Sequence, residues 1–181
     1  GAYVASLVVN DGKADSAADM VTITATAPVP WSMLKLPDTG QTTSYTATFG
    51  EDADYTINPM AFTNNLDGTV TDLNTGLMWQ QQDDDVMRQW ADAGTYCDGL
   101  TLGGQTDWRL PTKKELITIV NYGTYNPSID TTYFPNTNAS YYWSSTTDAY
   151  YTSYAWDVYF DFGLVNGYGY KTNYNYVRCV R

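Results

Sequence analysis

The side chains with the greatest capacity for chemistry crowd into residues 148–176, and their types favour binding over catalysis. This segment is rich in Tyr, Asn, Asp, Gly, Ser and Thr, contains no Glu, Gln, Met or Ile, and has Lys171 as its only basic residue. Tyr offers a large contact area at low entropic cost, and small polar residues adapt around it, as in antibody-type binding surfaces. The segment therefore predicts a recognition surface. The alternative is an ordinary tyrosine-rich region of strands and loops.

Nearly all residue types in this segment can also be produced from a single Asn codon by mutating only its adenines. Replacing the two adenines of the Asn codon AAC with any base gives Tyr, Phe and many small, polar or aliphatic residues, but never Lys, Glu, Gln, Trp or Met. Between residues 148 and 176 only Trp156 and Lys171 fall outside that set. The pattern indicates a segment that varies at adenines inside a fixed frame.

Catalytic motifs are scarce by comparison. The chain has no His, which excludes Ser-His-Asp and His-based metal sites. It contains no phosphate-binding or dinucleotide-binding motif. The spacing of its Asp and Glu residues does not identify any one pair as a general acid and a general base. We expect no enzyme activity, no metal site and no cofactor. Calcium could bind the three aspartates at residues 83–85, but a solvated helix start is the expected interpretation.

Composition and charge limit the partners. The chain has 181 residues, a hydrophobic content of 43% and a net charge of −11, which predicts a globular acidic protein. Such a protein is a poor partner for nucleic acid or anionic membranes. No apolar run approaches the roughly 20 residues of a membrane span, so we expect no direct membrane insertion. Abundant Tyr, Thr, Asn and Asp with few Lys is typical of a cell-surface or secreted protein.

The cysteines, Cys97 and Cys179, are too far apart in sequence for a metal finger. They are either two free thiols or one disulfide. Because the composition indicates export, where disulfides persist, we expect the bridge. It would join the first predicted helix to the last predicted strand.

The start of the chain predicts an appendage. Apolar residues alternate on both sides of an Asn-Asp-Gly-Lys turn at residues 10–13, which predicts a β-hairpin over residues 2–26. This hairpin resembles the last two strands of a PKD-type immunoglobulin-like domain, to which we assign residues 1–27. The proline-containing segment at 27–30 is stiff. We place a linker at residues 28–35 and the main domain at residues 36–181.

Turns and helices are predicted in the first half of the main domain. Asp67-Gly68 is a strong hairpin turn between Phe62 and Val70, Thr75-Gly76 is a second turn, and a buried strand begins at residues 77–79. The three aspartates suit a helix N-terminus, where the dipole is positive. Apolar residues then recur at helical spacing and predict a first helix over residues 83–100. Its buried face is Val86, Trp90, Ala93, Cys97 and Leu100.

The second half combines one helix with strands. Thr112 and Glu115 form a capping box, and a second helix follows with Leu116, Ile117, Ile119 and Val120 on its buried face. Thereafter the pattern has period two. Val158 and Phe160 point one way, while Asp157, Tyr159 and Asp161 point the other. We expect the last strand, around residues 177–179, to pair near residues 77–79 and bring the two ends of the domain together.

Six ordered motifs then identify a family. They are LPDTGQ at 36–41, DGTVTD at 67–72, TGLMW at 75–79, DWRLPTKKEL at 107–116, YWSST at 142–146 and YVRCVR at 176–181. Together they resemble the domain family found at the C-terminus of bacterial collagen-like adhesins. The resemblance implies an α+β protein with a C-type lectin-like fold, in which two helices flank small antiparallel sheets and the terminal strands pair.

Some members of this family resemble the variable proteins of diversity-generating retroelements. In those systems an error-prone reverse transcriptase converts the adenines of a template into any base, and the product replaces a repeat at the 3′ end of the gene. The resemblance implies a static scaffold that displays variable side chains to a ligand, which we expect to be a protein or another macromolecular surface. It places the variable region of this chain at residues 142–176.

The resemblance selects individual residues. The candidate variable, ligand-binding residues are Asp148, Tyr150, Tyr151, Ser153, Tyr154, Asp157, Tyr159, Asp161, Phe162, Leu164, Asn166, Gly167, Tyr168, Gly169, Tyr170, Asn173 and Tyr174. We expect about two-thirds of them to be solvent-exposed. The scaffold residues would be Trp143, Trp156, Val158, Phe160 and Val165. The main energetic anchors would be Tyr151, Tyr154, Tyr159, Tyr168 and Tyr170.

The sequence thus favours a retroelement-diversified receptor or adhesin. One alternative is a surface adhesin of fixed specificity that binds a glycan or matrix ligand. A remote alternative is an enzyme related to formylglycine-generating enzymes, which would need a reactive cysteine pair and a metal.

Overall fold

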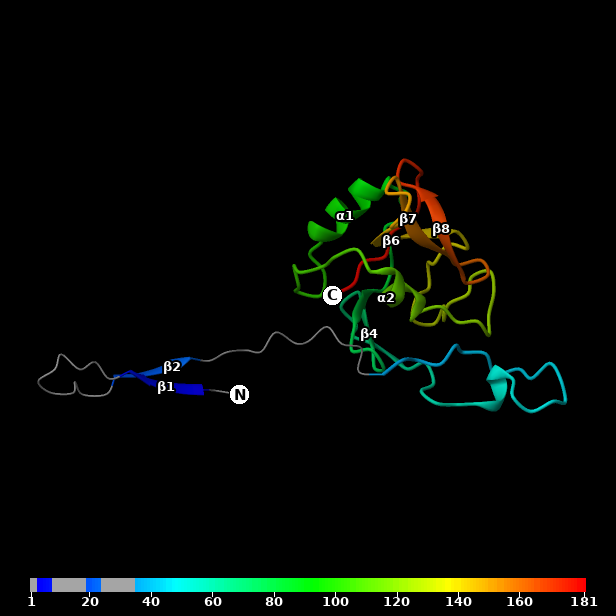
Figure 1. The fold of residues 1–181 in the computed structure, drawn as a ribbon, viewed down its shortest axis with the longest axis horizontal. Helices are drawn as coiled ribbons and strands as arrows, with labels where there is room; N and C mark the ends of the chain where they lie inside the picture. The colour runs from blue at the N-terminus through cyan, green and yellow to red at the C-terminus, as the bar shows by residue number, and fades with distance from the viewer. Residues whose placement is uncertain (1–2, 8–18, 24–34) are drawn as a thin grey trace, which may run out of the picture. The chain divides into compact units, whose positions relative to one another are not determined.

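The structure, a computed structural model, describes residues 3–7, 19–23 and 35–181. It divides into two compact units, Gly1–Ser32 and Met33–Arg181. In the first unit, β1 (Tyr3–Leu7) pairs antiparallel with β2 (Asp19–Ile23), which confirms the predicted hairpin (Figure 1). The predicted turn at residues 10–13 and the stiff segment at residues 27–30 lie outside the described residues.

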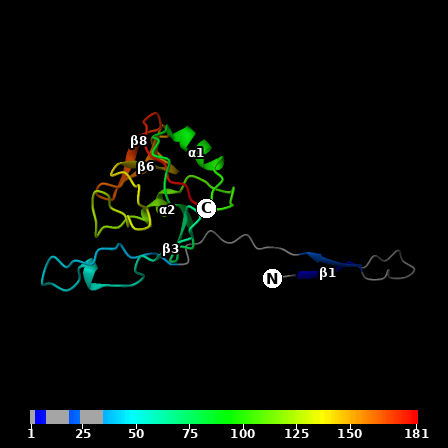
Figure 2. The same cartoon turned by 180° about the vertical axis from the view of Figure 1, so that it is seen from behind.

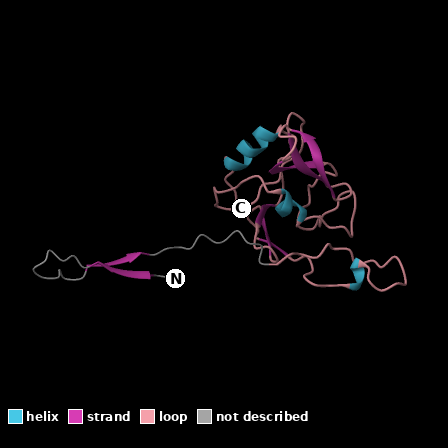
Figure 3. Cartoon of the chain, viewed as in Figure 1, coloured by secondary structure: helices cyan, strands magenta, loops and turns pink. Residues whose placement is uncertain are grey.

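Two antiparallel three-stranded sheets organise the second unit. The first contains β3 (Phe62–Asn64), β4 (Thr69–Asp72) and β5 (Met78–Gln80), and the second contains β6 (Tyr141–Thr147), β7 (Tyr154–Tyr159) and β8 (Leu164–Tyr170), both in sequence order. Long loops connect these short elements, and a 3₁₀ turn, η1 (Asp52–Asp54), lies in the segment before β3 (Figure 3). The unit is a small α+β domain, as predicted.

Side-chain hydrogen bonds form the turns of the first sheet. Between β3 and β4, Asp67 accepts hydrogen bonds from the N–H and the hydroxyl of Thr69 at 3.1 and 2.6 Å. Gly68 in this turn has a φ of 87°, a conformation that favours glycine. Between β4 and β5, the Asp72 carboxylate accepts a hydrogen bond from the Thr75 hydroxyl at 2.6 Å. Both predicted turns are confirmed.

The first helix is shorter than its apolar spacing predicts, because α1 spans Trp90–Asp98 rather than beginning at residue 83. Asp85 has a φ of 59°, which no α-helix contains, and Val86 is 48% exposed instead of lying on a buried face. The cause is tertiary. Asp83 is buried in an ion pair with Arg178, so the three aspartates form a loop around that pair and do not start the helix.

The second helix, α2 (Lys113–Ile117), has the predicted capping box. The Thr112 hydroxyl accepts a hydrogen bond from the Glu115 N–H at 3.3 Å, and Glu115 accepts one from the Thr112 N–H at 2.7 Å. Burial would raise the pKa of Glu115, but hydrogen bonds from Arg109 and Thr112 outweigh it and hold the pKa below its ordinary value. Glu115 therefore stays charged and joins the helix start to Arg109.

The C-terminal segment pairs with β5 near the beginning of the domain, as predicted, but through isolated bridges and not as the regular strand expected around residues 177–179. Met78 and Arg181 exchange two backbone hydrogen bonds, of 3.0 and 2.9 Å, and the Gln80 N–H donates to the Cys179 carbonyl at 3.0 Å. Residue 109 pairs with this segment in the same way through Val180. Both views place the C-terminus close to α2 (Figure 1, Figure 2).

A disulfide ties α1 to this segment. It joins Cys97 to Cys179, both fully buried, with a sulfur–sulfur distance of 2.03 Å, which confirms the predicted bridge. The bridge spans 82 positions of sequence. Closing so long a loop restricts the unfolded chain and contributes about 4 kcal/mol in the chain-entropy model.

Two clusters of buried side chains fill the domain. The larger draws on both sheets and α2, and its members include Trp79, Leu116 and Val158. The smaller surrounds the disulfide and includes Trp108 and Trp143. None of the helices in the described part of the chain has the length and apolar character that crossing a bilayer requires.

A charged residue, Arg178, is completely buried between these elements. Its guanidinium donates to the carbonyls of Gln80 and Gln81 at 2.8 and 2.5 Å, to the Thr137 hydroxyl at 2.9 Å and to the Asp83 carboxylate at 3.2 Å. Nothing in the sequence pattern distinguishes it from an exposed arginine in a terminal strand. The network connects the C-terminal segment to two loops that are remote in sequence.

The carboxylate partner of this arginine is held by further hydrogen bonds of its own. Asp83 accepts further hydrogen bonds from the Tyr142 hydroxyl at 2.8 Å and from Asn136 at 3.0 Å. Burial raises the pKa of Tyr142, so its hydroxyl remains a donor. Removing one member of a buried pair leaves the other charge without compensation, which is strongly destabilising.

We predict that Arg178→Met lowers the free energy of unfolding by roughly 3–5 kcal/mol, because it strands the buried Asp83 carboxylate. Arg181→Met is the matched control. Arg181 pairs with Asp107 at the surface, so its loss should cost less than about 1 kcal/mol. Chemical denaturation of the two variants measures the difference. Equal losses would show that the buried pair has no special role.

Candidate functional site

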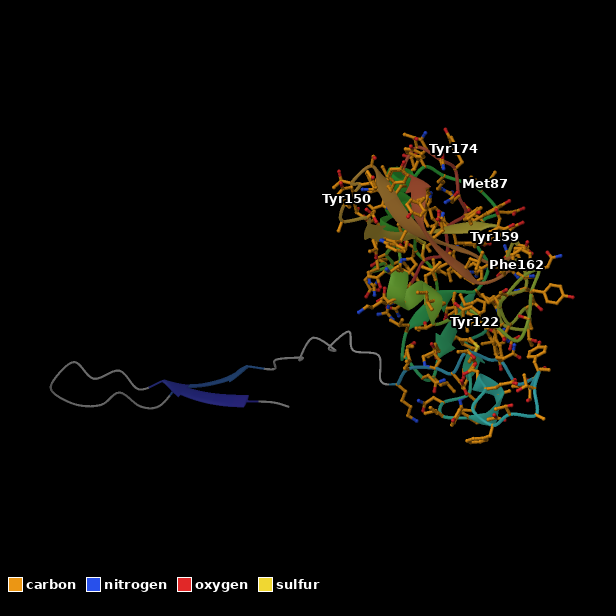
Figure 4. All side chains as sticks on the ribbon, turned by 45° about the vertical axis from the view of Figure 1, so that its right-hand side comes forward. Met87, Tyr122, Tyr150, Tyr159, Phe162 and Tyr174 are labelled. Carbon is orange, nitrogen blue, oxygen red and sulfur yellow. A yellow bond between two sulfur atoms is a disulfide. The ribbon has the colours of Figure 1, made fainter. Side chains whose placement is uncertain are left out.

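The candidate variable residues fall on two surfaces and not on one. In β7, successive side chains point to opposite faces of the sheet, so Tyr154 and Trp156 face away from Asp157 and Tyr159. Tyr154 pairs with Tyr170 of β8 across one face. Tyr159 lies between its partners on β6 and β8 on the other face. Figure 4 shows Tyr150 at one edge of the domain, with Tyr159 and Phe162 toward the opposite edge.

The first aromatic surface consists of Tyr150, Tyr151, Tyr154, Tyr168 and Tyr170. Their rings form a connected group. The ring centroids of Tyr154 and Tyr170 are 4.1 Å apart, those of Tyr150 and Tyr151 are 4.6 Å apart, and those of Tyr151 and Tyr154 are 5.6 Å apart. A hydrogen bond with Tyr170 raises the pKa of Tyr154 to about 12. The Tyr154 phenol therefore remains a neutral donor and acceptor throughout the physiological pH range.

A hollow opens beside this first aromatic surface. Its volume is about 340 Å³, and its lining residues are Asp148, Tyr150, Tyr151, Trp156, Val165, Asn166, Gly167 and Tyr168. The Lys113 ammonium of α2 lies over the Trp156 ring, 3.5 Å from its centroid. The hollow thus offers aromatic walls, an amide, a carboxylate and a nearby ammonium to one small group of a ligand.

Backbone and side-chain hydrogen bonds fix the loop that carries Tyr150 and Tyr151. The Asp148 carboxylate accepts hydrogen bonds from the N–H groups of both tyrosines, at 2.9 and 2.7 Å. The Lys171 N–H donates to the Ser153 carbonyl at 3.0 Å, and the Lys171 ammonium donates to the Thr147 hydroxyl at 2.8 Å. The loop is therefore held at both ends, which reduces the entropy that a ligand must overcome on binding.

The two residues outside the adenine-accessible set both have framework contacts. Trp156 is half-buried between Lys113 and the backbone of Gly167, whereas the Lys171 ammonium lies over the Trp90 ring, 4.1 Å from its centroid. Their contacts are therefore those of a scaffold. Lys113 itself was missed, because in the sequence it is only the first residue of a capped helix.

Of the seventeen candidate residues, nine are exposed, five are half-buried and three are buried, so fewer are fully exposed than the two-thirds expected. The exposed ones are Tyr150, Tyr151, Ser153, Phe162, Leu164, Tyr168, Tyr170, Asn173 and Tyr174. The half-buried ones are Asp148, Tyr154, Tyr159, Asp161 and Asn166. Among the scaffold candidates, Trp143, Val158 and Phe160 are fully buried.

The three buried candidates cannot present a side chain to a ligand, and each is buried for a reason. Gly167 packs beneath the Trp156 ring, where a Cβ would lie 3.1 Å from ring carbons. At Gly169 a Cβ would lie 2.4 Å from the Asp157 carboxylate and 2.7 Å from the Trp143 ring. Asp157 accepts a hydrogen bond from Asn175 at 3.2 Å, beneath the sheet. These positions support the surface from below.

Gly169→Ala should lower the free energy of unfolding by roughly 2 kcal/mol or more, because the new methyl group overlaps a carboxylate and an indole ring. Gly94→Ala in α1 is the matched control. A Cβ there meets no atom within 4 Å, so the change should stabilise the helix by roughly 0.5–1 kcal/mol. Thermal and chemical denaturation test both, and a neutral Gly169→Ala would contradict the packing described.

The stability of the domain should depend on pH through Asp157. Burial raises the pKa of Asp157 to about 6, and hydrogen bonds from Asn166 and Asn175 lower it only in part. Between about pH 4 and pH 6 the folded protein keeps a proton that the unfolded chain has released. The contribution of Asp157 to stability therefore falls as the pH rises through this window.

Asp157→Asn should remove this penalty. We expect the free energy of unfolding to rise by roughly 1–3 kcal/mol at pH 8 and to change little at pH 4, where the folded wild-type carboxyl is already protonated. Urea unfolding at the two pH values measures the difference. A gain that is the same at both would show that the charge is not its cause.

Comparison with known proteins assigns the family. The family model described as the Lcl C-terminal domain matches residues 68–181, which include every strand from β4 onward, both α-helices and the disulfide. A search of curated proteins gives no match to this chain. The LPDTGQ motif at residues 36–41 lies ahead of the matched range, and the other motifs lie within it or across its first residue. The match confirms the resemblance that these motifs indicate, and the chain belongs to the Lcl C-terminal domain family.

Proposed function

We propose that this protein is a ligand-binding receptor or adhesin whose first aromatic surface was diversified by a retroelement. The hollow is the observation that carries the proposal. Of its eight lining residues, five are candidate variable residues that present a side chain, whereas Gly167, Trp156 and Val165 are constant parts of the frame. A concave site whose walls vary while its base stays constant is what a display scaffold requires.

The chemistry of the surface supports a macromolecular ligand. Tyrosines at its centre provide large, rigid contact areas, which are typical of the residues that dominate binding energy. The hollow of about 340 Å³ is at the small end for a ligand pocket, so it suits one or two side chains or a single sugar ring. The tyrosines around it would supply the rest of the contact with a protein partner.

The scaffold supports a C-type lectin-like fold. Two helices accompany two small antiparallel sheets, the C-terminal segment pairs with β5, and a disulfide fixes that segment to α1. Such a frame can carry many sequences at residues 148–176, because its own contacts come from residues outside the exposed set. Membership of the Lcl C-terminal domain family also favours a variable, lectin-like binding domain.

Two further observations support the proposal. The first favours binding over catalysis, and the second favours a location outside the cytoplasm. Both cysteines are joined in the disulfide, so neither is the free thiol that chemistry of the formylglycine-generating type would need. A disulfide in a fold of this size is typical of oxidising compartments, which supports a cell-surface or secreted location.

The gene itself provides the test. Sequencing the DNA beyond its 3′ end should reveal a near-copy of the region that encodes residues 142–181, beside a gene for a reverse transcriptase. In that copy, AAC or AAT codons should stand at exposed positions such as Tyr150, Tyr168 and Tyr174. The codons for Gly167 and Gly169 should be glycine codons in both copies, because a side chain at either position would meet an indole ring.

Two results would count against the proposal. If no near-copy exists, the surface belongs to an adhesin of fixed specificity, with a glycan or matrix ligand. If the copy exists but its adenines fall as often on buried as on exposed positions, the first aromatic surface is not what the system diversifies.

A further inference from the structure

The other face of the β6–β7–β8 sheet carries a separate aromatic surface. This second aromatic surface consists of Tyr141, Tyr159, Phe162 and Leu164, which lie side by side on the three strands and the β7–β8 turn. Tyr159 is the direct cross-strand neighbour of both Tyr141 and Leu164. Its ring stacks on Tyr141 with centroids 4.3 Å apart and contacts Phe162 at 6.0 Å. Phe162 and Leu164 are 56% and 57% exposed.

A neighbouring loop holds the edge of this surface in place. The Tyr122 hydroxyl donates to the Gly163 carbonyl at 3.1 Å, and the Asn126 N–H donates to the Asp161 carbonyl at 2.9 Å. Tyr125, between them, is 77% exposed. The turn that carries Phe162 is therefore fixed, and further aromatic area lies beside it.

The Asp161 carboxylate is part of this second aromatic surface. Asp161 is half-exposed and accepts a hydrogen bond from the Tyr159 hydroxyl at 3.2 Å. Asp85 is exposed and accepts one from Asn138, three residues before Tyr141 in the chain, at 2.8 Å. Neither carboxylate takes part in any of the ion pairs found among residues 35–181.

Six of the eight basic residues within residues 35–181 have partners away from this surface. The arginines at 88, 109, 178 and 181 are paired with carboxylates. Lys113 and Lys171 are at the first aromatic surface, over Trp156 and Trp90. The two surfaces thus differ in charge. The first combines a carboxylate with ammonium groups, whereas the second combines aromatic faces with the Asp161 carboxylate.

We propose that the second aromatic surface binds a basic segment of a protein partner, with a Lys or Arg side chain packed on the Tyr159 and Phe162 rings and paired with Asp161. Aromatic faces attract cations, and the attraction is stronger where the cation loses water on packing. Apolar residues next to that Lys or Arg in the partner segment, such as leucine, would contact Tyr141 and Leu164. The net charge of −11 would steer a basic partner toward the protein.

This inference goes beyond the proposed function, which concerns the first aromatic surface, although Tyr159, Asp161, Phe162 and Leu164 also belong to the candidate variable set. The first aromatic surface could bind a diversified ligand while the second binds a basic partner, or either could act alone. A single domain with both would hold two partners on opposite faces of one sheet.

The test uses the full chain and a fluorescent peptide in which Arg alternates with Leu, read by fluorescence anisotropy. The controls are a peptide of equal length in which Glu replaces Arg, and spermine as a competitor that has charge without apolar contacts. We expect the Arg–Leu peptide to bind, the Glu–Leu peptide not to bind, and spermine to compete only weakly.

Variants locate the site. Asp161→Asn and Tyr159→Leu should each weaken binding of the Arg–Leu peptide by about threefold to tenfold, as the loss of a charge pair or a cation–π contact predicts. The matched control changes Asp92→Asn and Tyr45→Leu are at exposed residues that are distant in sequence from the second aromatic surface. Each should change the affinity for the Arg–Leu peptide by less than about twofold. Circular dichroism and melting temperature confirm that each variant is folded.

Three results would overturn the inference. Equal losses for Asp161→Asn and Asp92→Asn would show that only net charge attracts the peptide. Full competition by spermine would show that the aromatic residues are not part of the site. A Tyr168→Leu variant that weakens binding as much as Tyr159→Leu would place the peptide on the first aromatic surface. None of these results bears on the genomic test.

Discussion

The arrangement of this domain depends on one buried positive charge. Arg178 bonds to the end of β5, to the loop of three aspartates, and to the loop before β6, so one guanidinium joins three segments that are far apart in sequence. Because a charge in the interior is tolerated only when its partners are in place, the segments must all adopt their native positions together. The disulfide and the pairing with residue 109 then hold the same C-terminal segment from its other sides.

With its frame fixed in this way, the second sheet carries the candidate binding surfaces. The sheet has two faces. Buried side chains of the core cover the centre of each face, and the edges of both faces extend beyond this core. The tyrosines on either side consequently form two surfaces of different charge, although they come from one short stretch of sequence. Trp143 and Asp157 fill the space behind Gly169, so the sheet cannot be varied at that position without disturbing both.

Local features of the fold could be predicted from the sequence because their causes are local. The Asp67-Gly68 turn and the capping box of α2 depend on residues within a few positions of one another, and both are confirmed. The start of α1 could not be predicted, because Asp83 is withdrawn from the helix by an arginine 95 positions away. The division of the tyrosines between two faces was also missed. Composition indicates that they bind, but only strand register indicates on which side, and register here includes a shift between Ala155 and Asp157.

The register of β7 and β8 also limits how this protein can change over generations. Residues 142–176 run between a strand paired at Tyr142 and a segment bonded through Cys179, so neither end can move to absorb a change in length. Inserting one residue within a strand would turn every following side chain to the opposite face. Antibody loops evolve by changing both length and composition. If this protein is diversified as proposed, new specificities on its strands arise from substitutions that keep strand length constant.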